Sequence, residues 1–213
     1  MRIFAWAVAA LLLLSSHASA DIRITEVMSS SGATVDWFEL TNFGGSAVDI
    51  TGWKMDDGSN SFAASVALNG VTSINPGESV VFIESAGGAN VNSFKDFWFG
   101  AGNAPSGLKV GYYSGSGVSF SSSGDGVVVF DALGSTMAPL VTFAAATSGF
   151  SFDNFDGSLT INLPLSQVGV NGAFQSVGSP SNIGSPGAVP EPSALGLLAV
   201  AGVVAGSLRR KRS

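Results

Sequence analysis

Two glutamates are the residues best suited by type to do chemistry together. Glu26 and Glu39 lie in two short strand-like segments, at 21–27 and 37–43. A pair of carboxyl groups hydrolyses glycosides when the groups stand about 5.5 Å or about 6.5–9.5 Å apart in unlike environments. The pair therefore allows a carboxylate-dependent, carbohydrate-active hydrolase. Its place within strand-like segments also allows a purely structural role in a sheet.

Two turns carry oxygen atoms of the kind that calcium prefers. Their sequences are Asp56-Asp57-Gly58-Ser59-Asn60 and Asp153-Asn154-Phe155-Asp156-Gly157. Calcium binds carboxylate and carbonyl oxygens at about 2.3–2.6 Å, which makes Asp56, Asp57, Asp153 and Asp156 candidate ligands of a calcium-dependent binding module. Neither turn has the spacing of an EF-hand, and such turns also form through side-chain hydrogen bonds alone. No other metal and no organic cofactor is predicted.

An aromatic cluster lies in a stretch without a clear strand pattern. Phe94, Phe97, Trp98 and Phe99 fall within six residues and are followed by glycines at 100 and 102. One interpretation is an exposed platform on which sugar rings stack. The other is a segment whose aromatic rings close one end of the domain, because exposed apolar patches are uncommon in soluble proteins.

The composition removes several classes of enzyme. The chain has no cysteine, and its one histidine, His17, lies near the N-terminus. Residues 21–188 therefore cannot form a Ser-His-Asp triad, a cysteine nucleophile or the usual zinc sites. Between residues 21 and 188 there are fourteen acidic and four basic residues, a net charge of −10. This charge disfavours nucleic-acid binding.

The N-terminus has the pattern of a secretory signal peptide. Arg2 is followed by an apolar run at 3–14, and Ala18-Ser19-Ala20 is a small-x-small cleavage site. The mature chain is expected to begin at Asp21, after export through a translocon and cleavage by signal peptidase. The apolar run is too short to cross about 30 Å of hydrocarbon as a helix.

The C-terminus has three consecutive parts. Val189-Pro190-Glu191-Pro192 comes first, an uncharged segment at about 193–208 follows, and Arg209-Arg210-Lys211-Arg212 ends it. The two prolines favour an extended backbone that an enzyme can grip. As a helix the apolar segment reaches about 24 Å, which suits a transient or locally thinned membrane passage. The basic tail would remain on the cytoplasmic side.

This arrangement closely resembles the PEP-CTERM sorting signal of Gram-negative bacteria. The resemblance implies that a membrane enzyme, exosortase, processes the chain near Pro190-Glu191-Pro192. It also implies an inner-membrane intermediate, a final location at the cell surface or in the extracellular matrix, and a host that makes exopolysaccharide. Whether the apolar helix is removed or retained stays open.

The body of the chain, residues 21–188, predicts an all-β domain. Short strand-like runs are bounded by glycine, proline and aspartate turns, a spacing typical of β-sandwiches. The expected strands lie at 21–27, 37–43, 48–55, 79–83, 108–113, 118–120, 127–131, 140–144 and 159–163. Trp37 and Trp53 are expected in the core, since aromatic side chains bury large apolar areas.

The order of motifs in this body resembles the lamin-tail domain. The matching segments are ITEV at 24–27, DWFELTN at 36–42, VDITGWKMD at 48–56, INPGE at 74–78, SGDGVVVFD at 123–131 and GSPSN at 178–182. The resemblance implies an immunoglobulin-like β-sandwich, with residues 84–116 and 144–156 as departures from the family pattern. Long loops of this kind often carry binding specificity.

Together these features predict a signal peptide at 1–20, a lamin-tail-like domain at 21–188 and a sorting signal at 189–213. The leading interpretation is an exported, non-enzymatic protein with an adhesive or structural role. Its expected partners are exosortase, signal peptidase, the translocon, the membrane and exopolysaccharide. The hydrolase and the calcium-dependent module remain the alternatives.

Overall fold

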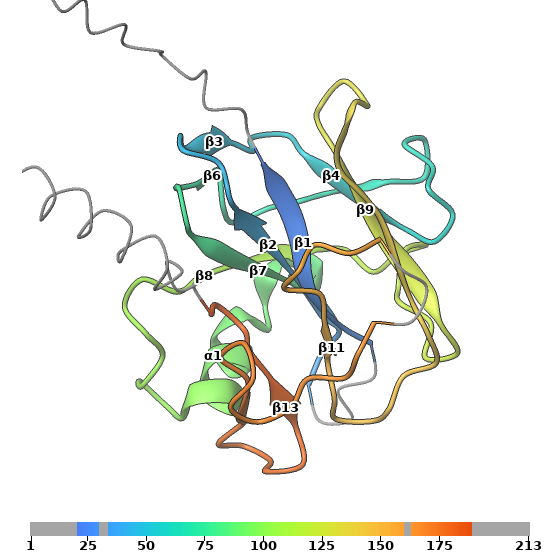
Figure 1. The fold of residues 1–213 in the computed structure, drawn as a ribbon. Coiled ribbons are helices and arrows are strands. Elements are labelled where there is room, and N and C mark those ends of the chain that lie inside the picture. Colours follow the sequence, from blue (N-terminus) through green and yellow to red (C-terminus); the bar gives the residue numbers. More distant parts are fainter. Residues whose placement is uncertain (1–20, 30–33, 160–162, 189–213) are drawn as a thin grey trace, which may run out of the picture.

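The computed structural model describes residues 21–29, 34–159 and 163–188, which form two layers of β-sheet (Figure 1). The larger sheet has the strand order β11-β1-β2-β7-β8. Its strands span Phe152–Asp153, Ile22–Met28, Trp37–Asn42, Ser79–Glu84 and Lys109–Tyr113. All pairs are antiparallel except β7 and β8. These two parallel strands are joined by a crossover that contains η1 (Ala86–Gly88) and α1 (Val91–Phe99).

The smaller sheet has the order β10-β9-β4-β5. Its strands span Thr136–Phe143, Asp125–Phe130, Lys54–Asp57 and Val66–Ala67. Two further ribbons complete the described part of the chain. They pair β3 (Val48–Asp49) with β6 (Ser73–Ile74) and β12 (Phe174–Gln175) with β13 (Ile183–Gly184).

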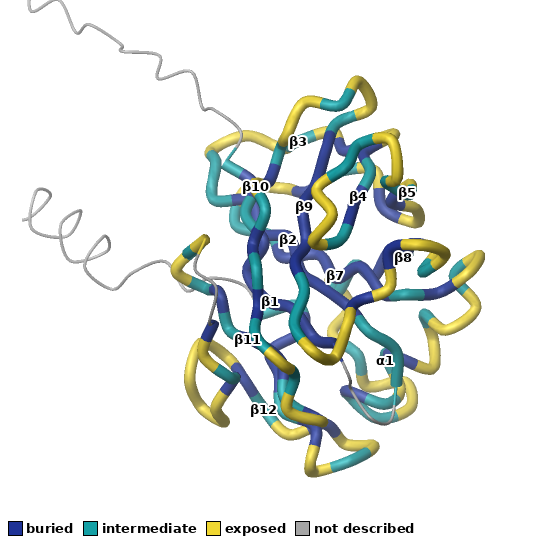
Figure 2. Tube along the Cα trace, turned by 90° about the vertical axis from the view of Figure 1, so that its right-hand side faces the viewer, coloured by how far each residue is buried: buried dark blue, intermediate teal, exposed yellow. Residues whose placement is uncertain are grey.

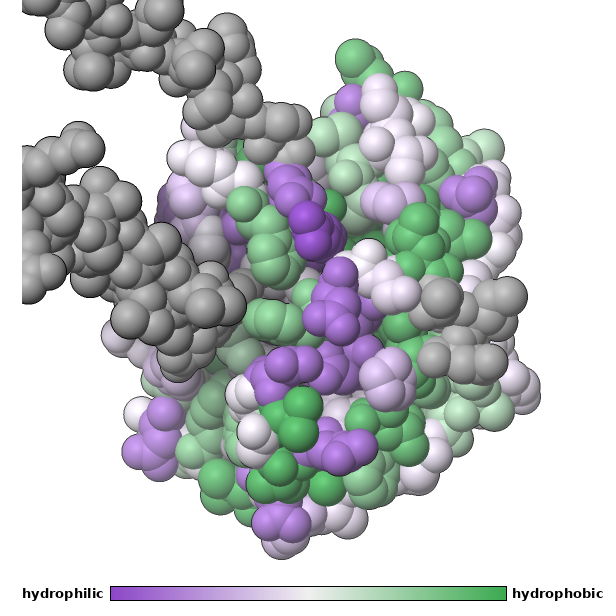
Figure 3. Space-filling model, in the orientation of Figure 1, coloured by the Kyte–Doolittle hydropathy of each residue, from purple (hydrophilic) through white to green (hydrophobic). Residues whose placement is uncertain are grey.

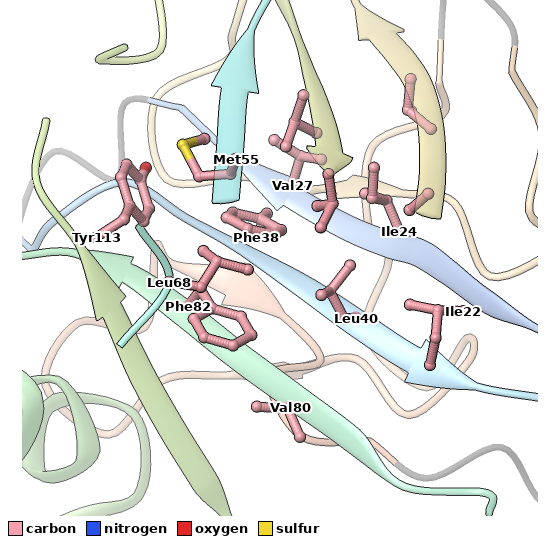
Figure 4. Close-up of a cluster of buried hydrophobic side chains, with 14 of the residues drawn as sticks. Ile22, Ile24, Val27, Phe38, Leu40, Met55, Leu68, Val80, Phe82 and Tyr113 are labelled. Atoms are coloured by element: carbon pink, nitrogen blue, oxygen red, sulfur yellow. The ribbon is translucent and has the colours of Figure 1, made fainter. Parts of the chain in front are cut away.

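The main core lies between the two sheets. Ile24, Leu40 and Phe82 of the larger sheet belong to one buried cluster with Met55 of the smaller sheet (Figure 4). Val129 of the smaller sheet is a buried member of the same cluster. Burial follows the strands through the centre and gives way to exposure at the loops (Figure 2). The predicted immunoglobulin-like sandwich is confirmed, because alternating apolar residues place one face of each sheet against the other.

The two predicted core tryptophans are both buried, but in different places. Trp53 belongs to the core between the sheets. Trp37 lies on the opposite face of β2, in a second cluster with Met28 and Phe94. The larger sheet is therefore covered on both faces.

Three strand-level expectations differ from the structure. Residues 118–120 form no strand, and residues 159 and 163 lie outside any strand, while 160–162 fall outside the described residues. The predicted strand at 48–55 is divided, because Gly52 adopts a φ of 77° in a turn between β3 and β4. Such a φ suits glycine and interrupts an extended chain.

No helix within the described residues is both long and apolar enough to cross a membrane. The expected signal peptide at 1–20 and the expected apolar segment at about 193–208 lie outside those residues.

Candidate functional site

A β-bulge in β1 decides where the two glutamates point. The register pairs Ile24 with Leu40 and Glu26 with Glu39, so Thr25 is an extra residue in β1. A bulge turns two consecutive side chains to one face of the sheet. Ile24 and Val27 consequently belong to the core between the sheets. The side chains of Thr25 and Glu39 meet on the other face, where the Thr25 hydroxyl donates to Glu39 Oε1 at 2.7 Å.

Glu26 is 1 % exposed and accepts hydrogen bonds from three serines. The backbone N–H of Ser185 donates to its Oε1 at 2.8 Å, and the Ser185 hydroxyl donates to its Oε2 at 2.8 Å. The hydroxyl of Ser151 also donates to Oε1, and that of Ser166 lies 3.3 Å from the same oxygen. Both oxygens of this carboxyl group are thus bound by groups of the protein itself.

Glu39 is 3 % exposed and is held in the same way. Its Oε1 accepts from Thr25, and the Thr41 hydroxyl lies 3.5 Å from the same oxygen. Its Oε2 accepts from the backbone N–H of Gly187 at 2.7 Å. Neither Glu26 nor Glu39 has a lysine or arginine partner in the part of the chain that the structure describes.

The donors from Ser185 and Gly187 belong to one short segment, residues 185–188, which we call the strap. The strap closes a turn in which the Ala188 N–H donates to the Ser185 carbonyl at 2.9 Å. Ser79 of β7 fixes its end by donating from its hydroxyl to the Ala188 carbonyl at 2.7 Å. Gly187 has a φ of 79°, and a Cβ atom there would meet Leu108 at 2.3 Å. The strap therefore follows a path that favours glycine at this position, since a side chain there would add backbone strain and require Leu108 or the strap to shift.

Burial raises the pKa of both carboxyl groups. The pKa of Glu26 rises to about 7, chiefly because burial disfavours its charge, although bonds from Ser151 and Ser185 oppose the rise. The pKa of Glu39 rises to about 8, first through burial and then through the negative charge of Glu26. Asp153, which pairs with Glu26 across β1 and β11, adds further repulsion. The site thus favours the protonated form of each group.

This arrangement makes the pair a docking site for the chain's own backbone. Every carboxyl oxygen already accepts a hydrogen bond from the protein. A glycoside would reach the pair only after the strap had left it. The structural role that the sequence allowed for Glu26 and Glu39 is the one that these contacts fit.

The aromatic cluster occupies the other half of the same sheet face. The structure corrects the expectation of an irregular segment, because these residues form α1. Phe94 and Trp98 are buried, at 1 % and 0 % exposure, and Phe97 and Phe99 are half-buried. Trp98 packs edge to face on Trp37, with ring centroids 5.8 Å apart.

The structure therefore corrects the expectation of an exposed platform for Phe94 and Trp98, which are both buried. Phe94 and Trp98 contact the sheet, so neither ring presents a free face to a sugar. Polar and apolar residues form several separate patches on the face of the molecule seen in Figure 3. The second interpretation places the aromatic rings at one end of the domain. Phe94 and Trp98 are buried as it expects, but the rings cover the outer face of the larger sheet.

The calcium candidates belong to two separate parts of the fold: Asp56 and Asp57 lie in β4, whereas Asp153 ends β11 and Asp156 lies in the turn after it. Asp56 is buried in β4, and its Oδ2 accepts from the Ser59 hydroxyl at 2.7 Å and from the Ser61 N–H at 2.6 Å. Asp57 accepts from the Ser59 N–H at 2.8 Å. The two aspartates thus shape their own turn.

The second turn is held in a similar way. Asp153 accepts from the Phe155 N–H at 2.9 Å and from the Asn171 side chain at 2.8 Å. Asp156 lies beside it, at the edge of a hollow of about 390 Å³. Within the described ranges, no three or more aspartate, glutamate, histidine or cysteine residues gather in a way that could hold a metal ion.

The remaining predicted site residues lie outside the described residues, except Asp21. They are Ala18 and Ala20 of the signal cleavage site, Val189, Pro190, Glu191 and Pro192 of the sorting motif, and Arg209, Arg210, Lys211 and Arg212 of the basic tail. Asp21, the expected first residue of the mature chain, forms an ion pair with Arg23 at 2.6 Å.

Comparison with known families identifies both parts of the chain. The lamin tail domain model matches residues 15–144, and the chain belongs to this family. The PEP-CTERM protein-sorting motif matches residues 188–212. This motif implies export, sorting toward the surface by way of the membrane, and processing by an exosortase. Both the lamin tail domain and the sorting motif are non-catalytic kinds of domain. No curated protein and no solved structure matches the chain.

The lamin tail match and the strap lie in different parts of the chain. The match ends at residue 144, while Ser151, Ser166, Ser185 and Gly187 follow it. The residues that complete the glutamate site therefore come from a C-terminal extension of the matched region.

Proposed function

We propose that this protein is a surface or matrix component of a Gram-negative cell, with an adhesive or structural role and without catalytic activity. In this proposal residues 1–20 are removed by signal peptidase after export. Residues 21–188 form the working domain, and residues 189–213 direct sorting, with an apolar membrane segment at about 193–208.

The observation that carries the proposal is that both glutamates are already hydrogen-bonded by groups of the protein itself. Glu26 and Glu39 are the carboxylates that the sequence offers as a candidate pair for hydrolysis. Both are buried, and both bind the strap through backbone N–H groups. A hydrolase needs one carboxyl group to reach a glycosidic oxygen, whereas these groups are committed to holding the domain together.

The charge of the domain supports an extracellular partner other than nucleic acid. Residues 21–188 carry a net charge of −10, which repels phosphate backbones. Exopolysaccharide is the partner we propose, since the sorting motif implies a route to the surface where such polymers accumulate.

The experiment that tests the proposal follows the chain in a cell that carries an exosortase. Mass spectrometry of the exported protein should find a first residue at Asp21 and a last residue near Pro190. The purified domain should be retained by the matrix of that cell and should release no reducing sugar from its polysaccharide. A full-length protein in the cytoplasm, or sugar release that is lost in Glu26→Gln, would contradict the proposal.

A further inference from the structure

The strap ends immediately before the sorting motif. The carbonyl of Ala188 accepts a hydrogen bond from Ser79. Val189, the first residue of the motif, follows directly. The sequence thus has no spacer between the bound Ala188 and the segment that a processing enzyme would grip.

The exit point of the chain is also flanked by the domain. Gly187 lies in a groove of about 340 Å³ between the turn at Pro76 and the loop that carries Pro105 and Leu108. The wall at Leu108 is close, since a Cβ atom on Gly187 would meet it at 2.3 Å. A bulky partner that approached the motif would meet this rim of the domain.

The available reach of the chain is short compared with the domain. From Ala188 to Pro192 a fully extended backbone spans at most about 14 Å. A domain of this length has a radius of gyration of about 15 Å. If the strap were released, the extended chain from Gly184 to Pro192 would span at most about 28 Å.

We propose that Glu26 and Glu39 hold the strap as a latch, and that the bound strap limits processing of the adjoining sorting motif by the membrane enzyme. The inference rests on the proposed function, since it concerns the access of that enzyme to the same motif. The latch consists of the Ser185 bonds to Glu26, the Gly187 bond to Glu39 and the Ser79 bond to Ala188.

Two glycines provide a matched test of the latch. Gly187→Ala places a side chain at a φ of 79° and against the tip of Leu108, so the strap or the Leu108 side chain has to shift. Gly102→Ala places the same side chain at a φ of 73°, with no atom within 4 Å. Both variants carry similar backbone strain, but only the first one adds a contact within the strap's groove.

The rate of processing of the full-length chain is then measured by pulse-chase in a cell that carries an exosortase. Gly187→Ala should be processed several-fold faster than the unmodified chain, and Gly102→Ala at the unmodified rate. A second variant, with about six glycine and serine residues inserted between Ala188 and Val189, leaves the strap intact and should also be processed several-fold faster. It keeps the test valid if Gly187→Ala folds poorly.

Equal processing rates for the unmodified chain and the insertion variant would overturn the latch. The double variant Pro190→Ala/Pro192→Ala separates this result from a failure of the proposed function. If that variant is not processed, the motif directs processing, and equal rates then count against the latch alone. If it is processed normally, the proposed function fails and the latch fails with it.

Discussion

The outer face of the larger sheet is divided into two halves that are covered in opposite ways. On one half, Met28, Trp37 and Ile83 pack under the aromatic helix α1. On the other half, Glu26 and Glu39 bind the strap through hydrogen bonds. Both halves are buried, and both are closed by segments that follow β1 and β2 in the chain.

The difference between the halves lies in how each cover can be removed. The apolar half is held by non-directional contact, which depends on area and fit. The polar half is held by a few directional bonds to carboxyl groups that are costly to bury when charged. The first half should therefore respond mainly to changes of volume, and the second to protonation and to the loss of single donors.

Trp98→Ala should give the largest loss of stability. Trp98 is fully buried and packs against Trp37, Phe94, Phe97 and Phe174. Truncation of a buried tryptophan costs about 3–5 kcal/mol of unfolding free energy. Urea unfolding followed by fluorescence would measure this loss. Leu133→Ala, at a residue that is 89 % exposed, is the control and should change stability by less than about 0.5 kcal/mol. Equal losses in the two variants would contradict the division of the sheet face.

A rise in pH should destabilise the polar half. The pKa values of Glu26 and Glu39 in the folded protein, about 7 and about 8, exceed the ordinary value of 4.5. The folded protein therefore binds more protons than the unfolded chain between about pH 4.5 and pH 8, so stability falls as pH rises through this range. Each unit of pKa difference corresponds to about 1.4 kcal/mol, which gives a loss on the order of a few kcal/mol.

Thermal unfolding as a function of pH would measure this effect, and Glu39→Gln is its control. The glutamine keeps an oxygen as an acceptor and removes one titrating group that faces Glu26. Its stability should fall less steeply with pH than that of the unmodified protein. A flat profile for the unmodified protein, or parallel slopes for the two proteins, would show that the pair does not govern the polar half.

Gly184→Ala tests the boundary between the halves. A Cβ atom at this position would lie 2.9 Å from Trp98, 3.0 Å from Glu26 and 3.0 Å from Ser151. We expect a loss of about 1–3 kcal/mol, as for other overpacked sites, together with a smaller effect of pH on stability. Gly107→Ala, which has no atom within 4 Å of the added Cβ, should be close to neutral. A neutral effect of Gly184→Ala would contradict the close packing between Trp98 and Glu26 at this boundary.

Ser185→Ala should have the smallest effect of the four changes. It removes the hydroxyl donor to Glu26 Oε2 and leaves the backbone N–H bond to Oε1 in place. The loss of one such bond costs about 1 kcal/mol. Chemical denaturation would measure it against Ser122→Ala, an exposed serine. A loss as large as that of Trp98→Ala would mean that the strap holds more of the domain than its contacts indicate.

The sequence predicts the sandwich well because strand signals are local. Apolar runs bounded by glycine or proline turns mark β1, β2, β7 and β9, and family motifs fall on or directly before these strands. The sequence does not predict helix α1, although Val91, Phe94 and Trp98 follow the i, i+3, i+7 spacing of a helix face. The helix is only nine residues long, so this spacing has little room to repeat.

The glutamate site could be predicted only in part. Strict alternation along β1 places Glu26 on the same face as Ile22 and Ile24, inside the sandwich. The bulge at Thr25 instead turns Glu26 to the outer face of the sheet. Nothing in the local sequence marks this bulge. The partners Ser185 and Gly187 lie far along the chain, beyond the last matching motif at 178–182, so their approach to Glu26 and Glu39 depends on the tertiary fold.

The bond between Glu26 and Ser185 joins residues 159 positions apart in the chain. A contact of such long sequence separation closes slowly, because the entropy of loop closure has to be lost before the contact is gained. The domain can complete its larger sheet face only after nearly all of its residues have emerged from the membrane. We expect this order of events to keep the chain incompletely folded during export. Folding would then be completed as the last residues of the domain arrive.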